Sequence, residues 1–546
     1  MPGARALRVT KVHDSRKWLG SIAALTTVSL VCLAVAAGPA PPAIDPGSVM
    51  NGASRIPPSL AGGAIARGGR FCLSGVRLGP QRGVKGSESN PPVTLDGVSV
   101  HIAQGNTDVP AGMLFVGAER IEGLIPNSAP LGPVRLTVVT EGRASEPYAL
   151  TLVDSSFGFF TTETAPEALA EARRPLSATP GETVALWGTG LDDARPDIFV
   201  GGQPAAAARR AGDESCCRGV DRIEFQIPAN ATQGCYVPVQ ARAAGRPSNV
   251  IGIAIHPAGR ACRDRFDWFH DSGQRAARAG FVVLARISLS MGASAGFAAG
   301  YQFDYAAAGF GKRPSGQSSP FPSLPPIGAC TVVTRRINLL RILGEAQIPG
   351  SWDLDAGPSI SVAGPAGLKV LRRGAHLRDI YDALLGGAIP LARVHSRPLY
   401  LQPGTYRLTS PGGQDVGPFT ARVEAQPPIQ WTNRDRLAEV QRSDGVRVEW
   451  KEASRKDAVL IAAGGSDAVT ADSAMCMCLA QAKDRRFTIP PVSLGNLPPT
   501  GDGGPVPGFL MLAEMPLEPP ARIQARGLDA VFAISISADA RTVKFR

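Results

Sequence analysis

From about residue 45 onward, apolar and polar residues alternate in short runs, which is the period of a strand that buries one face. Residues 446–450 (VRVEW) form such a run, and residues 405–409 and 531–536 carry similar strand signals. Proline recurs every few residues through most of the chain, and proline is excluded from helix interiors. The pattern therefore predicts an all-β chain with many turns and almost no long helix.

One sequence pattern recurs at a spacing close to the length of a domain. Residues 120–132 (RIEGLIPNSAPLG) and 222–234 (RIEFQIPANATQG) share R-I-E, then I-P, then a glycine, all at the same positions. A period of about 100 residues fits a β-sandwich rather than a short solenoid repeat. Residues 45–158 and 176–258 are therefore predicted to be two copies of one Ig-sized sandwich. Residues of one strand parity should face inward in both copies, namely Ile121, Ile125, Ile223, Phe225 and Ile227.

The second copy also carries a family pattern. It lies in residues 180–191 (PGETVALWGTGL), 200–205, 221–228 and 248–249. With these residues the copy resembles the uncharacterised Ig-like β-sandwich modules, related in pattern to IPT/TIG domains, of secreted acidobacterial proteins. The first copy resembles the same modules through residues 96–100 and 157–161 but lacks the tryptophan. The resemblance covers about 200 residues and implies fold and secretion, with no catalytic residues.

Strand signals continue after the second copy. Residues 402–406 (QPGTY) are typical of a hairpin turn, and residues 377–385 are the one short helix expected in this region. We interpret residues 263–425 as a β-rich domain and residues 426–546 as a C-terminal β-rich domain. The predicted architecture is all-β, with tandem Ig-like β-sandwiches followed by one or two further β-rich domains.

The N-terminus has the order of a secretory leader. Five basic residues precede an uncharged apolar run over residues 18–37, which ends in Ala34-Val35-Ala36 before a proline-rich segment. Residues 1–36 are predicted to be a signal peptide cleaved near Ala36. The alternative is an uncleaved N-terminal anchor, since about 20 apolar residues can span a bilayer. Either reading places the rest of the chain outside the cytoplasm, in the cell envelope or secreted, with membrane contact only through an uncleaved N-terminal segment.

Cysteine content fits an extracytoplasmic location. Eight cysteines follow the leader, and an even number outside the cytoplasm indicates disulfides. Adjacent Cys216 and Cys217 cannot both bond to Cys235, so at most one of them pairs with it. Cys217 with Cys235 is a possible disulfide, and the remaining connectivity is left open.

Charge argues against a nucleic-acid partner. The net charge is +11, and it falls to +7 when the leader is removed. Basic pairs such as Arg209-Arg210 and Arg372-Arg373 are far apart and are not interleaved with aromatic residues, as a nucleic-acid surface would require. We therefore interpret the basic residues as a solvated surface.

A candidate nucleophile lies at Ser294. Residues 292–296 (GASAG) satisfy the G-x-S-x-G pattern and follow a strand signal, and His376 and His395 lie downstream. A nucleophile elbow also needs a helix after the serine and a parallel sheet behind it, and glycine-rich, aromatic sequence follows instead. We therefore favour a turn of small residues and predict no catalytic residues.

No metal or cofactor site is predicted. Residues 475–478 (MCMC) offer soft sulfur ligands, but on a strand the cysteines face one side and the methionines the other. We interpret residues 475–478 as a buried strand or as contributors to a disulfide. Asp353 and Asp355 are interpreted as solvated charges, the histidines are isolated, and no nucleotide-binding fingerprint is present.

The remaining candidate is Trp187, at the end of an early strand of the second sandwich. Parity places Val184 and Leu186 on one face and Trp187 on the other, so an outward indole would offer a binding surface. The alternative is that Trp187 turns back and seals the end of the sandwich. The leading hypothesis is an exported non-catalytic protein that binds an extracellular protein or a polysaccharide. The alternatives are a structural spacer or envelope component and a secreted hydrolase that uses Ser294.

Overall fold

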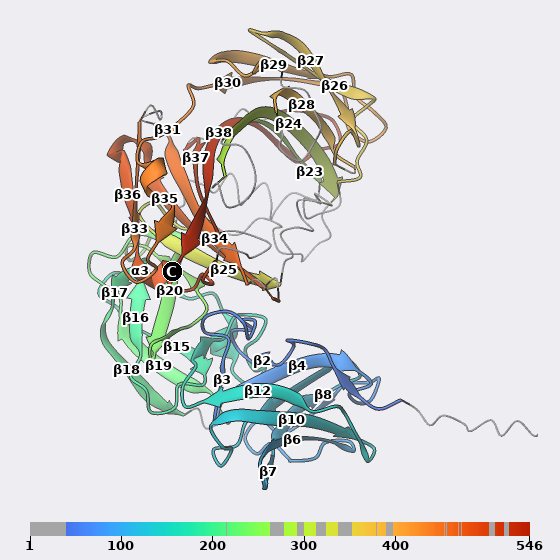
Figure 1. Cartoon of the computed structure of the whole chain (residues 1–546), viewed down its shortest axis with the longest axis vertical. Helices are drawn as coiled ribbons and strands as arrows, with labels where there is room; N and C mark the ends of the chain where they lie inside the picture. The colour runs from blue at the N-terminus through green and yellow to red at the C-terminus, as the bar shows by residue number, and fades with distance from the viewer. Residues whose placement is uncertain are drawn as a thin grey trace, which may run out of the picture. The chain divides into compact units, whose positions relative to one another are not determined.

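The described secondary structure elements of the computed structural model are nearly all strands (Figure 1). It describes residues 40–546 except 214–215, 263–277, 292–299, 313–323, 337–351, 378, 389–396, 452–453, 455, 468, 471, 502–507 and 518–522. The leader predicted at residues 1–36 therefore lies outside the described residues. In the part of the chain that is described, no helix has the length and apolar character needed to cross a membrane.

The first module is a sandwich of two sheets around one core. One sheet has β1 (Ala43–Ile44), β4 (Arg70–Val76), β9 (Arg120–Leu124), β8 (Gly112–Val116) and β5 (Val84–Lys85) in that order, with β2 (Met50–Asn51) on β4. The other has β3 (Ile65–Ala66), β12 (Tyr148–Val153), β10 (Gly132–Thr140), β6 (Val98–Gln104) and β7 (Thr107–Pro110), with β11 (Arg143–Ala144) on β10. Alternate residues of both sheets, such as Leu73 and Val100, fill the core.

The second module repeats this arrangement, with counterparts of four of the six strands in the first sheet and of all six in the second. One sheet has β13 (Gly158–Phe159), β15 (Thr183–Thr189), β19 (Asp221–Gln226) and β18 (Ala206–Asp213). The other has β14 (Ser177–Ala178), β22 (Ile251–Ile255), β20 (Gly234–Ala243), β16 (Asp197–Val200) and β17 (Gln203–Pro204), with β21 (Arg246–Pro247) on β20. In both modules a short strand joins the second sheet in parallel, β3 on β12 and β14 on β22.

The repeated sequence pattern therefore marks equivalent strands. Residues 120–124 form β9 and residues 222–226 lie in β19, which hold the same place in their sheets. The inward parity is confirmed, because each of the five side chains expected inside has an exposed fraction of 0%: Ile121, Ile125, Ile223, Phe225 and Ile227. Inside a filled core, even the loss of one methyl group should be measurable.

We expect Ile223→Val to lower the free energy of unfolding by about 0.5–1.5 kcal/mol, because one buried methyl group is removed from the core of the second sandwich. Urea denaturation of the full chain measures the change. Val469→Ala is the control, since Val469 is 92% exposed and should change stability by less than about 0.5 kcal/mol. Equal losses in the two variants would contradict the assigned strand register.

Strands from the remaining chain join one large sheet. In order, it contains β25 (Cys330–Arg336), β35 (Asp472–Gln481), β34 (Ala458–Ser466), β37 (Gly508–Met515), β38 (Ala530–Phe545), β23 (Arg278–Ser290), β24 (Tyr301–Lys312), β28 (Tyr381–Gly387), β27 (Gly367–Arg373), β26 (Ser359–Gly364), β29 (Gly404–Ser410) and β30 (Phe419–Ala425), with β32 (Glu439–Val440) on β38. A small sheet has β31 (Gln430–Trp431), β33 (Val446–Lys451) and β36 (Arg486–Ile489).

This sheet does not divide at residue 425, where the sequence placed a domain boundary. β38, from the expected C-terminal domain, pairs in parallel with β23, and β25 pairs with β35. Two cores nevertheless form, one around Tyr381 and Tyr406 and the other around Trp450 and Phe545. The long strand β38 contributes to both, because its first half packs in one core and its second half in the other. Local strand patterns carry no information about such long-range pairing.

Within the described ranges, helical structure is confined to single turns. The helix expected at residues 377–385 is wrong, because residues 381–387 form β28 and pair with β24. The described helical elements are the 3-10 turns η1 (Ala170–Arg173), η3 (Arg434–Arg436) and η4 (Ala482–Asp484) and the short helix α3 (Pro491–Leu494). The turn η1 lies in the segment between the two sandwiches and helps to enclose the site described next.

Candidate functional site

The site begins with the outer face of one sheet of the first sandwich. On β4 the apolar Phe71 and Leu73 point into the core, so Arg70 and Cys72 point away from it. On β9 the same alternation buries Ile121 and turns its neighbours Arg120 and Glu122 outward. Charged side chains from two adjacent strands therefore share one face.

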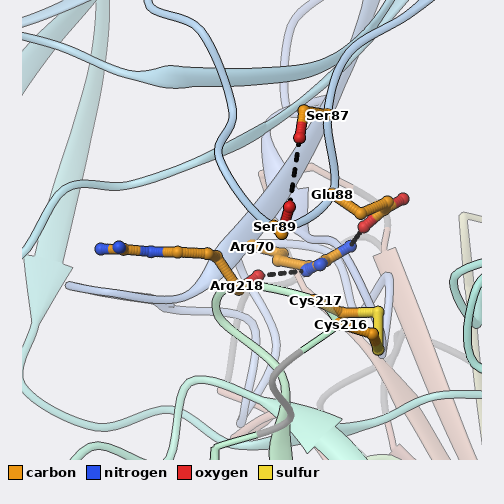
Figure 2. Close-up of a disulfide and its surroundings, with 7 residues drawn as sticks. All are labelled: Arg70, Ser87, Glu88, Ser89, Cys216, Cys217 and Arg218. Carbon is orange, nitrogen blue, oxygen red and sulfur yellow. Dashed lines mark hydrogen bonds and ion pairs between the residues drawn. A yellow bond between two sulfur atoms is a disulfide. The ribbon is translucent and has the colours of Figure 1, made fainter.

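Arg70 is buried on this outer face, with an exposed fraction of 6%. Its Nη1 lies 2.7 Å from Oε2 of Glu88, and its Nε donates to the backbone carbonyl of Arg218 at 2.8 Å (Figure 2). The backbone N–H of Arg218 in turn donates to the carbonyl of Glu88 at 2.9 Å. Burial lowers the pKa of Arg70, and the neighbouring Glu88 carboxylate opposes that shift. Arg70 thus ties a loop of the first sandwich to a loop of the second.

A disulfide between adjacent cysteines precedes Arg218 in the second loop. Cys216 bonds to Cys217, as the yellow sulfur bond in Figure 2 shows. Cys217 is fully buried in a small apolar cluster with Phe160, Leu169 and Val220. The disulfide and its packing hold the backbone next to Arg218, and hence the carbonyl that Arg70 contacts.

Trp187 lies beneath the segment that joins the two sandwiches. Val184 and Leu186 fill the core, as strand parity predicted, and Trp187 is on the opposite face. There the indole is half-buried against the apolar cluster of Phe160 and Cys217, and the Trp187 carbonyl accepts a hydrogen bond from the Phe160 N–H at 3.0 Å. The linker thus covers part of the indole face on which a binding surface was one of the two alternatives.

A cavity of about 420 Å³ remains between the linker and the outer face of the first sandwich. Its size falls in the range of small-molecule sites. The sheet and its loops contribute Gly52, Arg55, Arg70, Phe71, Lys85, Gly86, Glu88, Leu114, Phe115, Arg120 and Glu122, and the linker contributes Phe160, residues 163–168 and Arg173. We name this space the linker cavity.

Ion pairs organise the charges in the linker cavity. Glu122 lies 3.5 Å from Nη2 of Arg55 and 3.6 Å from Nη1 of Arg120. The guanidinium of Arg120 also stacks over the ring of Phe115, 4.7 Å from its centroid. The cavity wall therefore contains cationic donors, carboxylate acceptors and an aromatic ring.

Two buried donor atoms at the linker cavity have no hydrogen-bond partner among the described residues: Nη2 of Arg70 and Nε of Arg55. Buried donors are normally satisfied, and an unsatisfied one costs about 1–3 kcal/mol. Both atoms are covered by protein, so a molecule in the linker cavity contacts them only if the arginine side chains move.

The residues that line the linker cavity are not among the candidates predicted from the sequence. The R-I-E pattern marks the fold repeat, and its Arg120 and Glu122 also line the cavity. Strand register places Thr183 of the second sandwich at the position that Arg70 holds in the first. The first copy thus has a buried arginine where the second has an exposed threonine.

The pairing expected between Cys217 and Cys235 is wrong. Cys217 bonds to Cys216, and Cys235 bonds to Cys262 with 5.2 Å between Cα atoms. Strand pairing gives the reason, because β22 runs antiparallel to β20 and returns the chain beside Gly234, just before Cys235. Cys235 is closer in sequence to Cys217 than to Cys262, but it is Cys262 that lies beside it in space.

Peptide mapping without reductant should recover these pairs. We expect the tryptic peptide with Cys216 and Cys217 to lack two thiol hydrogens while remaining a single peptide, because its cysteines are joined to each other. The peptides with Cys235 and Cys262 should appear as one cross-linked species that separates on reduction. A cross-link between the Cys217 and Cys235 peptides would overturn this assignment.

The structure does not gather the other sequence candidates into a catalytic centre. Ser294 and His395 lie outside the described residues, so the elbow hypothesis is not tested. His376 contacts the buried Asp382 carboxylate, with 2.8 Å from Nδ1 to Oδ2. Asp355 lies outside the strands and accepts the backbone N–H groups of Gly357 and Gln414, which lower its pKa.

The MCMC segment lies in β35 with its cysteines on one face. Cys478 bonds to Cys330, and the Cys476 sulfur lies 3.7 Å from the Cys478 sulfur. Cys476 is fully buried, and burial raises its thiol pKa to about 12. Met477 packs in a different apolar cluster from the two cysteines, as strand parity predicted. The segment is thus a buried strand and a disulfide contributor.

A second cavity of about 420 Å³ lies where β30 approaches β38. Its lining includes Arg286, Asp457 and Glu514. Burial raises the pKa of Glu514 to about 7, and the hydrogen-bonded Asp457 acts in the same direction. Glu514 Oε1 also accepts the backbone N–H of Ser454 at 2.5 Å. The Glu514 carboxyl group therefore has hydrogen-bond partners within the protein, whereas Arg70 Nη2 and Arg55 Nε have none among the described residues.

Comparisons with known proteins leave the family open. No protein-family model matches the chain, and no curated protein matches it. Among solved structures, titin Ig tandem domains A164-A165 match at 10% identity over 35% of this chain and 90% of theirs, with a TM-score of 0.13. Sidekick-1 immunoglobulin domains 1–4 match at 9% identity over 86% and 98%, with a TM-score of 0.12.

A glycan utilisation protein is also similar. The Bacteroides ovatus mixed-linkage glucan utilization locus protein SGBP-B, in complex with a mixed-linkage heptasaccharide, matches at 9% identity over 74% of this chain and 78% of its own, with a TM-score of 0.14. TM-scores this low carry no functional argument. The function must therefore be argued from the site itself.

Proposed function

We propose that the chain is an exported, non-catalytic binding protein whose ligand occupies the linker cavity. The observation that carries the proposal is a cavity of about 420 Å³ whose lining includes Arg55, Arg70 and Arg120. Arginine side chains in a concave site can donate hydrogen bonds to a ligand.

The surroundings of the linker cavity favour a preformed site. Arg70 is fixed by Glu88 and by the carbonyl of Arg218, and the disulfide of Cys216 and Cys217 holds the backbone next to that carbonyl. A side chain already held by two contacts loses little conformational entropy when a ligand arrives. The sandwiches would serve as a rigid scaffold, and the linker and loops would carry the binding groups.

Export is part of the proposal and rests on the leader pattern together with three disulfides. The N-terminal sequence of the protein recovered from the producing cells tests it, with Ala37 expected as the first residue. An intact leader in the membrane fraction would favour the N-terminal anchor. A reduced chain in the cytoplasm would contradict export altogether.

A binding screen with matched variants tests the cavity. The full chain is screened by calorimetry against neutral oligosaccharides, acidic oligosaccharides and peptides. We expect Arg70→Gln to weaken any ligand found by roughly ten- to hundredfold, the value of one or two charged hydrogen bonds. Arg222→Gln is the control because Arg222 holds the position of Arg120 in the second sandwich and does not line the linker cavity.

Thermal denaturation of each variant shows whether it is folded. If every compound fails to bind, or if both arginine variants weaken binding equally, the linker cavity is not the binding site. The chain would then fit a structural spacer or envelope component. The hydrolase alternative has its own test, since Ser294→Ala should leave turnover of ester and glycoside substrates unchanged if the chain is non-catalytic.

A further inference from the structure

The disulfide of Cys216 and Cys217 directly precedes a residue that joins the two sandwiches. The carbonyl of Arg218 accepts a hydrogen bond from Nε of Arg70 at 2.8 Å (Figure 2). The backbone N–H of Arg218 donates to the carbonyl of Glu88 at 2.9 Å. Because Arg70 and Glu88 line the linker cavity, these two backbone contacts connect the disulfide to that cavity.

This disulfide encloses much less chain than the other two described disulfides. Cys216 and Cys217 are neighbours in the sequence, whereas the cysteines of the other two pairs are 27 and 148 positions apart. A disulfide stabilises a fold mainly by restricting the unfolded chain, and this effect grows with the length of the enclosed loop. The bond between Cys216 and Cys217 therefore contributes least to global stability, and breaking it leaves the rest of the chain folded.

One cysteine of the pair is open to a reagent, and the other is covered. Cys216 is partly exposed, whereas Cys217 is fully buried in the apolar cluster that contains Phe160 and Val220. A thiol in solution therefore reaches Cys216 first. The disulfide also closes a small ring with the peptide bond between the two cysteines, which restricts the backbone of both. Opening this ring returns rotational freedom to the backbone directly before Arg218.

The loop beyond Arg218 is held without the disulfide. The Gly219 carbonyl accepts a hydrogen bond from Oγ1 of Thr189 at 2.6 Å, and that hydroxyl oxygen accepts the backbone N–H of Arg70 at 2.8 Å. Neither contact involves a cysteine. Opening the disulfide therefore loosens the Arg218 backbone, while Gly219 keeps its contact with the second sandwich.

We propose that Cys216 and Cys217 form a redox switch that controls how firmly Arg218 holds Arg70 and thereby regulates the linker cavity. The regulation of binding rests on the proposed function. In the oxidised chain Arg70 is held in place. In the reduced chain the Arg218 carbonyl no longer fixes it, so a ligand would have to order the side chain and would bind more weakly.

A dithiol is the reductant that the switch requires. One thiolate of the dithiol attacks the Cys216 sulfur, the bond between the two cysteines breaks, and the Cys217 sulfur leaves with the electron pair and takes up a proton. The second thiol of the dithiol then displaces Cys216 from the mixed disulfide. The dithiol is oxidised to a disulfide by two electrons, and both cysteines become thiols.

Hydrogen exchange measured by mass spectrometry tests the switch without any ligand. The unaltered full chain is compared with the double variant Cys216→Ser, Cys217→Ser, which reproduces the open ring. We expect the Arg218 amide to exchange roughly tenfold or more faster in the variant, because its hydrogen bond to Glu88 is no longer held. The Arg70 amide, whose acceptor lies outside the loop, should keep its rate. Equal exchange at Arg218 in the two proteins would overturn the proposal.

Thermal denaturation distinguishes a switch from a disulfide that the fold requires. The double variant of Cys216 and Cys217 should keep its Tm within about 2 °C of the unaltered chain. The matched control replaces Cys235 and Cys262 with serine, and its Tm should fall further because that disulfide encloses a longer loop. An equal fall in the two variants, or a Cys216 and Cys217 variant that does not fold, would overturn the switch.

Titration with dithiothreitol applies the test to the unaltered chain. Free thiols are alkylated at each concentration and located by peptide mapping. We expect Cys216 and Cys217 to be alkylated at concentrations that leave the buried disulfide of Cys330 and Cys478 intact. If the two disulfides open together, Cys216 and Cys217 are not a separate redox switch.

The calorimetric panel of oligosaccharides and peptides separates regulation from binding. A panel compound that binds the unaltered chain should bind roughly tenfold more weakly to the double variant of Cys216 and Cys217, since Arg70 is no longer held in place. Equal affinity would overturn the regulatory role. If no panel compound binds either protein, the binding function fails, and exchange at Arg218 still decides whether the disulfide controls the contact between the sandwiches.

Discussion

Replacing Asp304 with alanine should lower the free energy of unfolding by about 3–5 kcal/mol, the typical effect of breaking a buried charge pair. Asp304 lies in β24 with an exposed fraction of 0%. Its carboxylate accepts Nε and Nη2 of Arg286 at 2.8 and 2.9 Å and the backbone N–H groups of Tyr400 and Leu401 at 2.6 and 2.7 Å. The variant leaves the Arg286 charge and two backbone donors without this acceptor.

Urea denaturation of the full chain measures the loss. A second variant that also replaces Arg286 with methionine should recover part of the stability, because the uncompensated charge is removed while the two backbone donors stay unsatisfied. Glu449→Gln is the matched surface control. Its partner Arg447 is 54% exposed, and such pairs contribute about 1 kcal/mol or less. A loss for Asp304→Ala no larger than for this control would contradict the structural role of the buried pair.

Glu514 should make stability depend on pH in the direction opposite to an ordinary paired carboxylate. Its folded pKa is raised to about 7 by burial and by Asp457, whereas the ordinary value is 4.5. Below about pH 4.5 both states carry the proton, so the contribution of the neutral acid is fully present. It is lost as pH rises through about 7, for a total on the order of 2–3 kcal/mol after allowance for coupling to Asp457.

Unfolding free energies at several pH values between 4.5 and 8 check this dependence. We expect Glu514→Gln to be less sensitive to pH than the unaltered chain, because glutamine cannot ionise. Glu424→Gln serves as the control, since Glu424 is exposed on β30 and lines the same cavity. If Glu514→Gln and the unaltered chain lose equal stability over this range, Glu514 does not ionise with a raised pKa.

Strand faces and the repeat were set by local sequence. The alternation around Ile223 and Phe225 identified the buried face, and the same parity put Val184 and Leu186 in the core with Trp187 outside. A strand turns successive side chains to opposite faces whatever lies beyond it. The pattern of residues 120–132 and 222–234 likewise identified two copies of one module, because equal spacing of strand, turn and glycine produces equal strands.

Tertiary structure alone decided which segments meet. The linker cavity takes Arg70 from β4, Glu88 from a loop and Phe160 from the linker, while the Arg218 carbonyl that fixes Arg70 comes from the second sandwich. Disulfide partners depend on the same kind of meeting, as Cys235 and Cys262 show. So does the single sheet that joins β23 to β38 across more than two hundred residues. Alternation within a strand is a property of a few neighbouring residues, whereas strand order and loop contacts depend on the packing of the whole chain. The alternation in β4 therefore predicts the sheet face on which Arg70 lies, but it does not predict the residues that Arg70 contacts.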